Sequence, residues 1–206
     1  MTDTPRLSRA FFARGACVVA PALLGKRLVR QHNGRFLCGI VVETEAYCDA
    51  AEPDLACHGD RANQGRPTAR TAVMFGPPAH AYVYFTYGVH WMFNVVTGQD
   101  GEANAVLIRA LEPVDGVEVM IGNRNGRSLP DLTNGPVKLT QALAIDKSLN
   151  GANLCQPDGV IWFADAPAVD SAHVCTGPRI GLGQTPEPWL SIPWRYWLSG
   201  SPYVSK

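Results

Sequence analysis

The most constraining feature of this sequence is a pair of turn signals, each set between stretches rich in β-branched and aromatic residues. Asn33-Gly34 lies between residues 26–31 and 36–47, and Asn-Gly is a strong signal for a two-residue β-hairpin turn. Tyr87-Gly88 separates two further stretches of this kind. Hairpins join neighbouring antiparallel strands, so the sequence predicts a mostly antiparallel sheet.

The remaining elements are predicted from capping residues and apolar patterns. Residues 48–72 show little periodicity and are expected to form a long loop, a feature that is usually functional. We expect helices over residues 9–14, over a segment ending at Gly25, from Glu112-Pro113 to Ile121 and over residues 136–144, and strands over residues 81–86, 91–97 and 105–111. With neither a repeat nor a linker, the pattern predicts an α/β chain of the α+β type. It would be a single compact domain over residues 1–206, in which helices surround a curved sheet.

The charges cancel overall but are unevenly distributed. The 206 residues hold 18 Lys+Arg and 18 Asp+Glu, so the formal net charge is zero at pH 7. Residues 43–60 contain six acids and no Lys or Arg, whereas residues 61–70 contain Arg61, Arg66 and Arg70 and no acid. Binding of nucleic acid by bulk positive charge is therefore excluded. Local attraction to phosphate stays open, with solvated surface patches as the alternative.

The cysteines and the lack of a long apolar run indicate in which cellular compartment the protein is expected. No run of 18 apolar residues occurs, so no transmembrane helix is predicted, and the first residues lack the order of a signal peptide. We therefore expect an intracellular protein with reduced cysteines. Cys48, Cys57 and His58 are the best candidate metal ligands, but no fourth ligand is apparent. Buried hydrophobic cysteines are the alternative, and we predict no metal or cofactor.

Two acids and a tyrosine end the long predicted strand. Side chains alternate along a strand, so Glu43, Glu45 and Tyr47 share one face. Because burial of an unpaired carboxylate is costly, the acids either emerge into water or include a general base with a raised pKa. Arg109, alone in a later apolar strand, needs a partner such as Glu45; a purely structural ion pair is the alternative.

Tyr87 lies at the tip of the second predicted hairpin, where a ring has little core to enter. It either packs back across the hairpin or serves as a wedge that enters a base stack.

Short motifs from about residue 8 to residue 205 together carry a family resemblance. They include Leu-Leu-Gly-Lys at 23–26, Val-Glu-Thr-Glu-Ala-Tyr at 42–47, Met-Phe at 74–75, Tyr-Val-Tyr at 82–84, Arg-Ala-Leu-Glu-Pro at 109–113, Lys-Leu-Thr-Gln-Ala-Leu-Ala-Ile at 138–145, Lys-Ser at 147–148, Pro-Arg-Ile-Gly at 178–181 and Gly-Ser-Pro at 200–202. The set resembles the alkyladenine (3-methyladenine) DNA glycosylases of the mammalian AAG/MPG type, which also occur in bacteria.

The resemblance implies a catalytic group. Glu45 matches the general base that activates the attacking water, and Arg109 matches an arginine that helps to hold this water. The main chain at Ile180 matches a further water contact. No lysine falls at a matched catalytic position, so neither a Schiff base nor strand cleavage is expected.

The resemblance also implies a base pocket and DNA contacts. Tyr47 matches one wall of the pocket, and His58 and Tyr84 match the opposite wall, with the main-chain N–H of His58 donating to the edge of the extruded base. Asn94 matches a residue that crowds the exocyclic amino group of guanine. Tyr87 matches the side chain that fills the gap left in the duplex. The residues expected to face phosphates are Lys138, Lys147, Arg70 and Gly181.

The sequence also departs from the family pattern. The loop between Tyr47 and His58 is about two residues longer than in the mammalian members, Cys57 replaces a small residue, and Thr-Ala-Arg-Thr at 68–71 replaces Thr-Pro-Arg-Asn. These changes affect the shape of the loop and therefore the substrate preference that the resemblance implies for the protein.

The implied function is that of a monofunctional glycosylase. It would flip alkylated or deaminated purines out of double-stranded DNA and start base excision repair, as a monomer in the bacterial cytoplasm and nucleoid or in a eukaryotic nucleus. Two alternatives remain, a non-catalytic DNA damage-binding protein and an RNA-binding domain.

Overall fold

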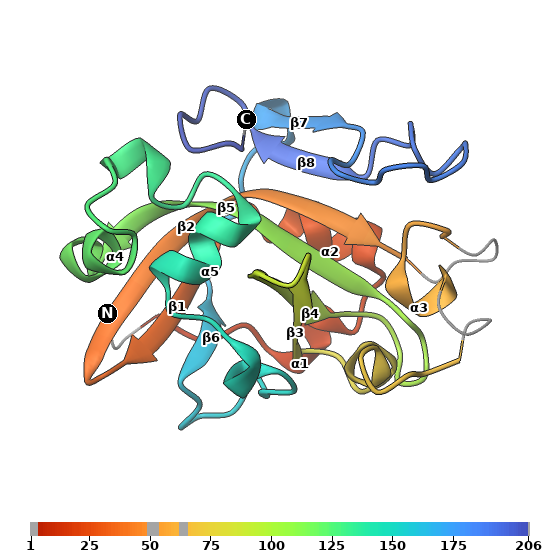
Figure 1. The fold of residues 1–206 in the computed structure, drawn as a ribbon, viewed down its shortest axis with the longest axis horizontal. Helices are drawn as coiled ribbons and strands as arrows, with labels where there is room; N and C mark the ends of the chain where they lie inside the picture. Colours follow the sequence, from red (N-terminus) through yellow and green to blue (C-terminus); the bar gives the residue numbers. More distant parts are fainter. Residues whose placement is uncertain (1–3, 49–53, 62–65, 206) are drawn as a thin grey trace.

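A single antiparallel sheet organises the computed structural model, which describes residues 4–48, 54–61 and 66–205 (Figure 1). The strands are β1 (Arg27–His32), β2 (Arg35–Tyr47), β3 (Ala81–Thr86), β4 (His90–Val96), β5 (Ala105–Asp115), β6 (Ile161–Ala164), β7 (Val174–Gly177) and β8 (Arg195–Leu198). Their order is β3-β4-β5-β2-β1-β6, with β8 beside β2 and β7 beside β8. The predicted compact α+β domain with a mostly antiparallel, curved sheet is confirmed.

The long strand β2 is the centre of this sheet. It pairs with β5 on one side, and on the other side it pairs with β1 through residues 35–40 and with β8 through residues 43–45. Its register against β5 shifts near Gly39 and on both sides of Glu43. Such irregularities bend a strand and increase its twist, so β2 connects two differently oriented parts of the sheet.

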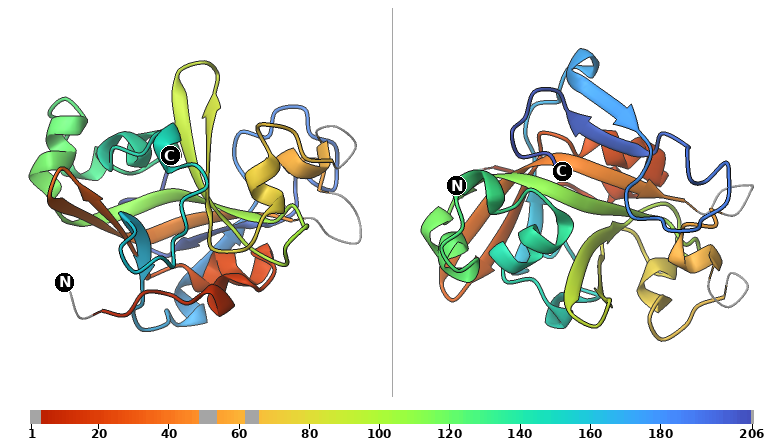
Figure 2. Two further views of the ribbon diagram at one scale, coloured as in Figure 1. Left: turned by 90° about the horizontal axis from the view of Figure 1, so that it is seen from below. Right: turned by 45° about the horizontal axis from the view of Figure 1, so that its top comes forward.

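Both predicted hairpin turns are present. Asn33 and Gly34 have φ angles of 49° and 74°, the left-handed values that a type I′ turn requires. At the second turn, Tyr87 and Gly88 have φ angles of 51° and 70°. The β3–β4 hairpin that carries this second turn projects from the sheet (Figure 2, left).

Short helices cover the sheet. They are α1 (Arg9–Phe12), α2 (Ala16–Ala22), α3 (His58–Arg61), α4 (Val117–Asn123) and α5 (Pro136–Ala142), with 3₁₀ turns at Ala72–Phe75, Leu129–Asp131, Lys147–Leu149 and Ser171–His173. Helix α2 packs on β2 and β5, and α5 packs on β4 and β5. Phe12, Phe93 and Phe163 are fully buried, and the Phe163 ring centroid lies 5.8 Å from that of Phe12 and 6.3 Å from that of Phe93.

The predicted start of the helix at Glu112-Pro113 is wrong. Strand β5 continues to Asp115 because β2 is long enough to pair with Glu112 and Pro113. Helix α4 begins only after Gly116, whose φ of 70° allows the chain to turn. Pairing with β2 therefore overrides the local helix-start signal of the proline.

The N-terminal helices are shorter than expected. Helix α1 stops at Phe12, and Ser8 occupies the capping position without a side-chain capping bond. Helix α2 ends at Ala22, three residues before Gly25. Within the expected long loop, the described part contains α3. The loop between Tyr47 and His58, where we expect extra length, falls partly outside the described residues, and the Arg61 side chain is not described. Among the helices of the described residues, none is both long and apolar enough to cross a membrane.

Candidate active site

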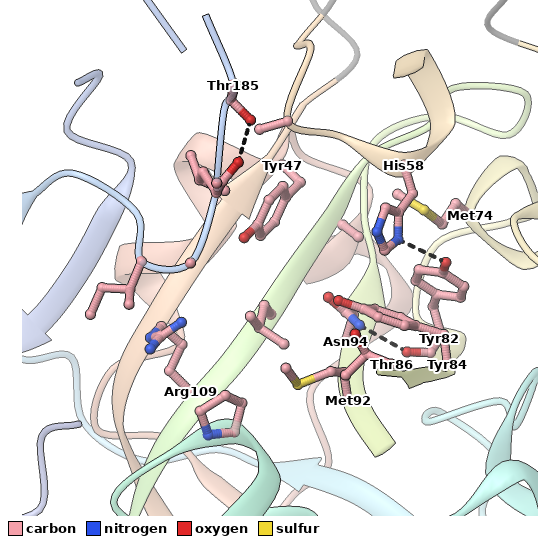
Figure 3. A pocket seen from close by; sticks show the side chains of 18 of the residues that line it. Tyr47, His58, Met74, Tyr82, Tyr84, Thr86, Met92, Asn94, Arg109 and Thr185 are labelled. Carbon is pink, nitrogen blue, oxygen red and sulfur yellow. Dashed lines mark hydrogen bonds between the residues drawn. The ribbon is translucent and has the colours of Figure 1, made fainter. Parts of the chain in front are cut away.

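A cavity of about 470 Å³ lies where β2, the β3–β4 hairpin and the loop after β7 meet (Figure 3). The predicted site residues Tyr47, His58, Tyr84, Tyr87, Asn94, Arg109, Ile180 and Gly181 line it, together with Ala56, Met74, Tyr82, Thr86, Met92, Ala105, Leu107, Pro136 and residues 182–185. These residues come from separate parts of the chain, from Tyr47 at the end of β2 to residues 180–185 after β7. The fold thus brings together the residues that the resemblance assigns to a base pocket.

Glu45 lies beside the cavity and is fully buried. Its Oε1 accepts a hydrogen bond from the Ile180 N–H at 2.7 Å and lies 3.2 Å from Arg109 Nη1. Its Oε2 accepts a hydrogen bond from the Tyr47 hydroxyl at 2.9 Å. Burial raises the pKa of Glu45 above its ordinary value and Glu43 adds to the rise, whereas Arg109, the Ile180 N–H and the Tyr47 hydroxyl oppose it. A buried carboxylate with a raised pKa is a good proton acceptor.

Arg109 joins the two acids of β2. Its Nε donates to Glu43 Oε1 at 3.0 Å, while its Nη1 faces Glu45. The predicted need of Arg109 for a carboxylate partner is therefore met by two carboxylates. Glu43 is further compensated by Arg195 Nη1 at 3.1 Å and by the N–H and hydroxyl of Ser205 at 2.7 and 2.8 Å. Glu43 received no role from the sequence, although strand alternation places it on the same face as Glu45.

Aromatic side chains form two walls of the cavity. Tyr47 lies on one side, and His58 and Tyr84 lie on the other (Figure 3). The His58 and Tyr84 rings meet edge to face with centroids 4.7 Å apart. His58 Nδ1 is hydrogen-bonded to the Tyr82 hydroxyl at 3.2 Å, so Tyr82, which belongs to the quoted Tyr-Val-Tyr motif but received no role from the sequence, holds this wall in place.

Asn94 belongs to the same side as Tyr84. It is buried on β4, and its Nδ2 donates to the main-chain carbonyl of Tyr82 at 3.1 Å. This bond fixes the amide plane where it lines the cavity.

Tyr87 projects from the tip of the β3–β4 hairpin. Its side chain is 84% exposed, so the alternative in which it packs back across the hairpin is wrong. The hairpin is stabilised below the tip by Phe85 and Trp91, whose ring centroids lie 4.6 Å apart. A bulky residue in the left-handed region is strained, and such strain concentrates at functional sites.

The four expected phosphate contacts have different surroundings. Lys138 Nζ binds Asp131 at 2.6 Å and Asn134 at 2.8 Å, so it would have to exchange these partners for a phosphate. Lys147 and Gly181 are exposed. The Arg70 guanidinium lies 4.9 Å from the centre of the Tyr84 ring, at the cavity wall.

The candidate metal ligands do not form a cluster. Cys48 Sγ lies 3.0 Å from Cys17 Sγ, and Cys57 Sγ donates to the Ala103 carbonyl at 3.3 Å. In the part of the chain that the structure describes, no group of three His, Cys, Asp or Glu side chains could hold a metal ion.

The chain is similar to known proteins over nearly its whole length. A family model described as "Methylpurine-DNA glycosylase (MPG)" matches residues 10–202. A protein of Carboxydothermus hydrogenoformans is 46% identical over 97% of this chain and 98% of its own. A protein of Methanocella arvoryzae is 45% identical, with 98% and 96% covered. Both carry the name "Putative 3-methyladenine DNA glycosylase". Because these matches span every element that builds the cavity, the chain belongs to the methylpurine-DNA glycosylase family.

Proposed function

We propose that this protein is a monofunctional DNA glycosylase. It extrudes an alkylated or deaminated purine from double-stranded DNA and hydrolyses the bond between the base and the sugar. The observation that carries the proposal is the Glu45 carboxylate, held by Arg109 and the Ile180 N–H at the edge of an aromatic-walled cavity.

Base extrusion accounts for the hairpin and the cavity together. A base inside a duplex cannot reach a buried carboxylate, so the nucleotide must rotate out, at a cost of a few kcal/mol. The exposed Tyr87 ring is suited to fill the vacated space. The extruded purine would stack between Tyr47 and the wall formed by His58 and Tyr84. Alkylated, electron-poor bases gain most from such aromatic faces.

Glu45 performs the chemistry in this proposal. It takes a proton from a water molecule, the water oxygen bonds to C1′ of the sugar, and the bond from C1′ to the base breaks. The products are a free base and an abasic site. A carboxylate also favours the positive charge that develops on the sugar, as in glycoside hydrolysis. Since the Glu45 side chain is covered, we propose that the Tyr47 hydroxyl gives up its place on Oε2 to the water.

Strand cleavage needs an amine that forms a Schiff base with the sugar. Among the described residues, no lysine lines the cavity, which supports a hydrolytic and monofunctional reaction. A covalent complex trapped by borohydride reduction would contradict this part of the proposal.

The deciding experiment compares Glu45→Gln with the wild type. We expect excision to fall by about 10²–10⁴-fold, the usual contribution of a general base, while binding to damaged duplex is retained. Base release is measured from duplexes that carry 3-methyladenine, 7-methylguanine, hypoxanthine or ethenoadenine. Glu118→Gln is the matched control, because Glu118 is an exposed acid on α4, away from the cavity.

The outcomes separate catalysis from mere binding. Near-normal excision by Glu45→Gln would refute the role of Glu45. Lesion binding without base release by the wild type would support the alternative, a non-catalytic damage-binding protein.

A further inference from the structure

A second ion pair lies next to the proposed site and is unused by the mechanism. Arg179 and Asp54 are both fully buried and meet through two contacts, Nη1 to Oδ2 at 2.6 Å and Nη2 to Oδ1 at 2.9 Å. Removing an ion pair from water is costly, so a buried pair is weak evidence of a stabilising role. Its neighbours indicate what it does here.

Arg179 binds the end of β2 on one side. Its Nη1 donates to the carbonyl of Ala46 at 3.0 Å, and its guanidinium lies 4.7 Å from the centre of the Tyr47 ring. It also donates to the Trp189 carbonyl at 3.2 Å and lies 5.1 Å from the Trp194 ring. The guanidinium thus supports the face of the Tyr47 ring and the peptide just before it.

Asp54 connects the same arginine to the opposite wall. Its carboxylate accepts hydrogen bonds from the N–H groups of Cys48 and Ala56, at 3.4 and 3.0 Å. Ala56 lines the cavity two residues before His58. The carboxylate therefore holds the chain on either side of the loop that leads from Tyr47 to His58.

Arg179 is also next in the chain to a group that contacts Glu45. The next residue, Ile180, donates its N–H to Glu45 Oε1 at 2.7 Å. Rotation or shift of the Arg179 main chain would carry this N–H away from the carboxylate.

We propose that Arg179 and Asp54 are positioning residues, which align the Ile180 N–H with Glu45 and set the Tyr47 and His58 walls without touching the substrate. The inference rests on the proposed function, since it assigns these residues a task in the same reaction.

The expected signature is a change in the titration of Glu45. The charged and titratable groups that face Glu45 are Arg109, Arg179, Glu43, Tyr47 and Tyr84. Of the groups that stabilise its charged form, the Ile180 N–H follows Arg179 in the chain and the Tyr47 hydroxyl belongs to the ring that Arg179 supports. Loss of the hydrogen bond from the Ile180 N–H raises the pKa of Glu45 further. The acidic limb of the excision rate should then move to higher pH by about one unit.

Two variants test the pair. Arg179→Lys keeps the charge but loses the planar two-pronged contact, and Asp54→Asn keeps the shape but loses the charge. Single-turnover excision is measured from pH 5 to pH 9, together with the affinity for lesion duplex and the thermal melting temperature. We expect a lower maximal rate and a smaller change in affinity for both variants. The acidic limb should move upward in Arg179→Lys, whereas in Asp54→Asn the unpaired Arg179 charge near Glu45 opposes this rise. Asp54→Glu should recover part of the rate.

A matched control separates positioning from loss of stability. Lys26 and Asp165 form another ion pair, at 2.7 Å, in which the lysine is buried and lies outside the cavity. Lys26→Gln should lower the melting temperature without moving the pH profile. Because Arg179→Lys can unfold the protein, the result for Asp54→Asn decides between a positioning role and loss of stability.

The proposal is overturned if Asp54→Asn keeps the wild-type pH profile and loses rate only in proportion to its folded fraction. The failure of the proposed function would look different, because Glu45→Gln would then excise normally whatever the Arg179 and Asp54 variants do.

Discussion

Glu43 and Glu45, two residues apart on β2, have different electrostatic surroundings. Glu43 is surrounded by Arg109, Arg195 and two donors from Ser205. Glu45 has a single ion-pair partner among the described residues, Arg109, and its pKa is raised by burial. Pairs of acids with different surroundings usually divide into a permanent counter-ion and a group that exchanges protons. These different surroundings support the proposed role of Glu45 as the base, with Glu43 as a permanent counter-ion.

This assignment has a consequence for stability. A carboxyl whose pKa is raised by folding contributes stability fully below its unfolded pKa, and loses that contribution as the pH rises through its folded pKa. Glu45→Gln removes the buried charge, so the melting temperature of the variant relative to the wild type should rise between pH 5 and pH 8. Differential scanning calorimetry at both pH values measures this difference. A difference that shrinks toward pH 8 would show that the fold favours the charged form of Glu45.

At the scale of elements, the β3–β4 hairpin combines a stem stabilised by packed aromatic rings with an exposed tip. The turn chemistry of Tyr87-Gly88 predicts the hairpin, and its left-handed φ angles confirm the turn.

The predicted start of a helix at Glu112-Pro113, in contrast, is wrong. A proline predicts only what the local chain prefers, whereas the partner strand β2 decides how far β5 extends.

The exposed tip makes Tyr87→Ser an informative change. Base–aromatic stacking contributes roughly 1–3 kcal/mol, so affinity for lesion duplex should fall by about 5- to 150-fold. The melting temperature should stay unchanged because the side chain is 84% exposed. Fluorescence anisotropy with an ethenoadenine duplex measures the affinity. Val18→Ser, at a 53% exposed position on α2, is the control; equal affinities of the two variants would exclude a wedge role for Tyr87.

At the scale of the whole molecule, the zero net charge reflects internal pairing as well as surface patches. Glu43, Glu45 and Asp54 of the acidic stretch 43–60 are buried, and they are paired with Arg109, Arg195 and Arg179. Solvated surface charge is therefore the wrong interpretation for these three acids. The three arginine partners are held in these ion pairs and are largely buried, which disfavours their binding to DNA phosphates.

This distribution predicts weak binding to undamaged DNA. Each phosphate neutralised by the protein adds about −0.9 to the slope of log K against log salt concentration. We expect a slope that corresponds to only a few phosphates, measured by titrating an undamaged duplex between 50 and 200 mM salt. A slope equivalent to eight or more phosphates would show that the surface charge is arranged differently.

The sequence by itself determined the features that depend on near neighbours along the chain. Asn33-Gly34 specifies its turn, and the period of two along β2 places Glu43, Glu45 and Tyr47 on one face. Only the tertiary structure decided which groups meet these side chains. Ile180 lies 135 residues from Glu45, and Arg179 lies 125 residues from Asp54. No local pattern encodes such contacts, because they form only when distant segments pack together and burial makes each unpaired charge costly.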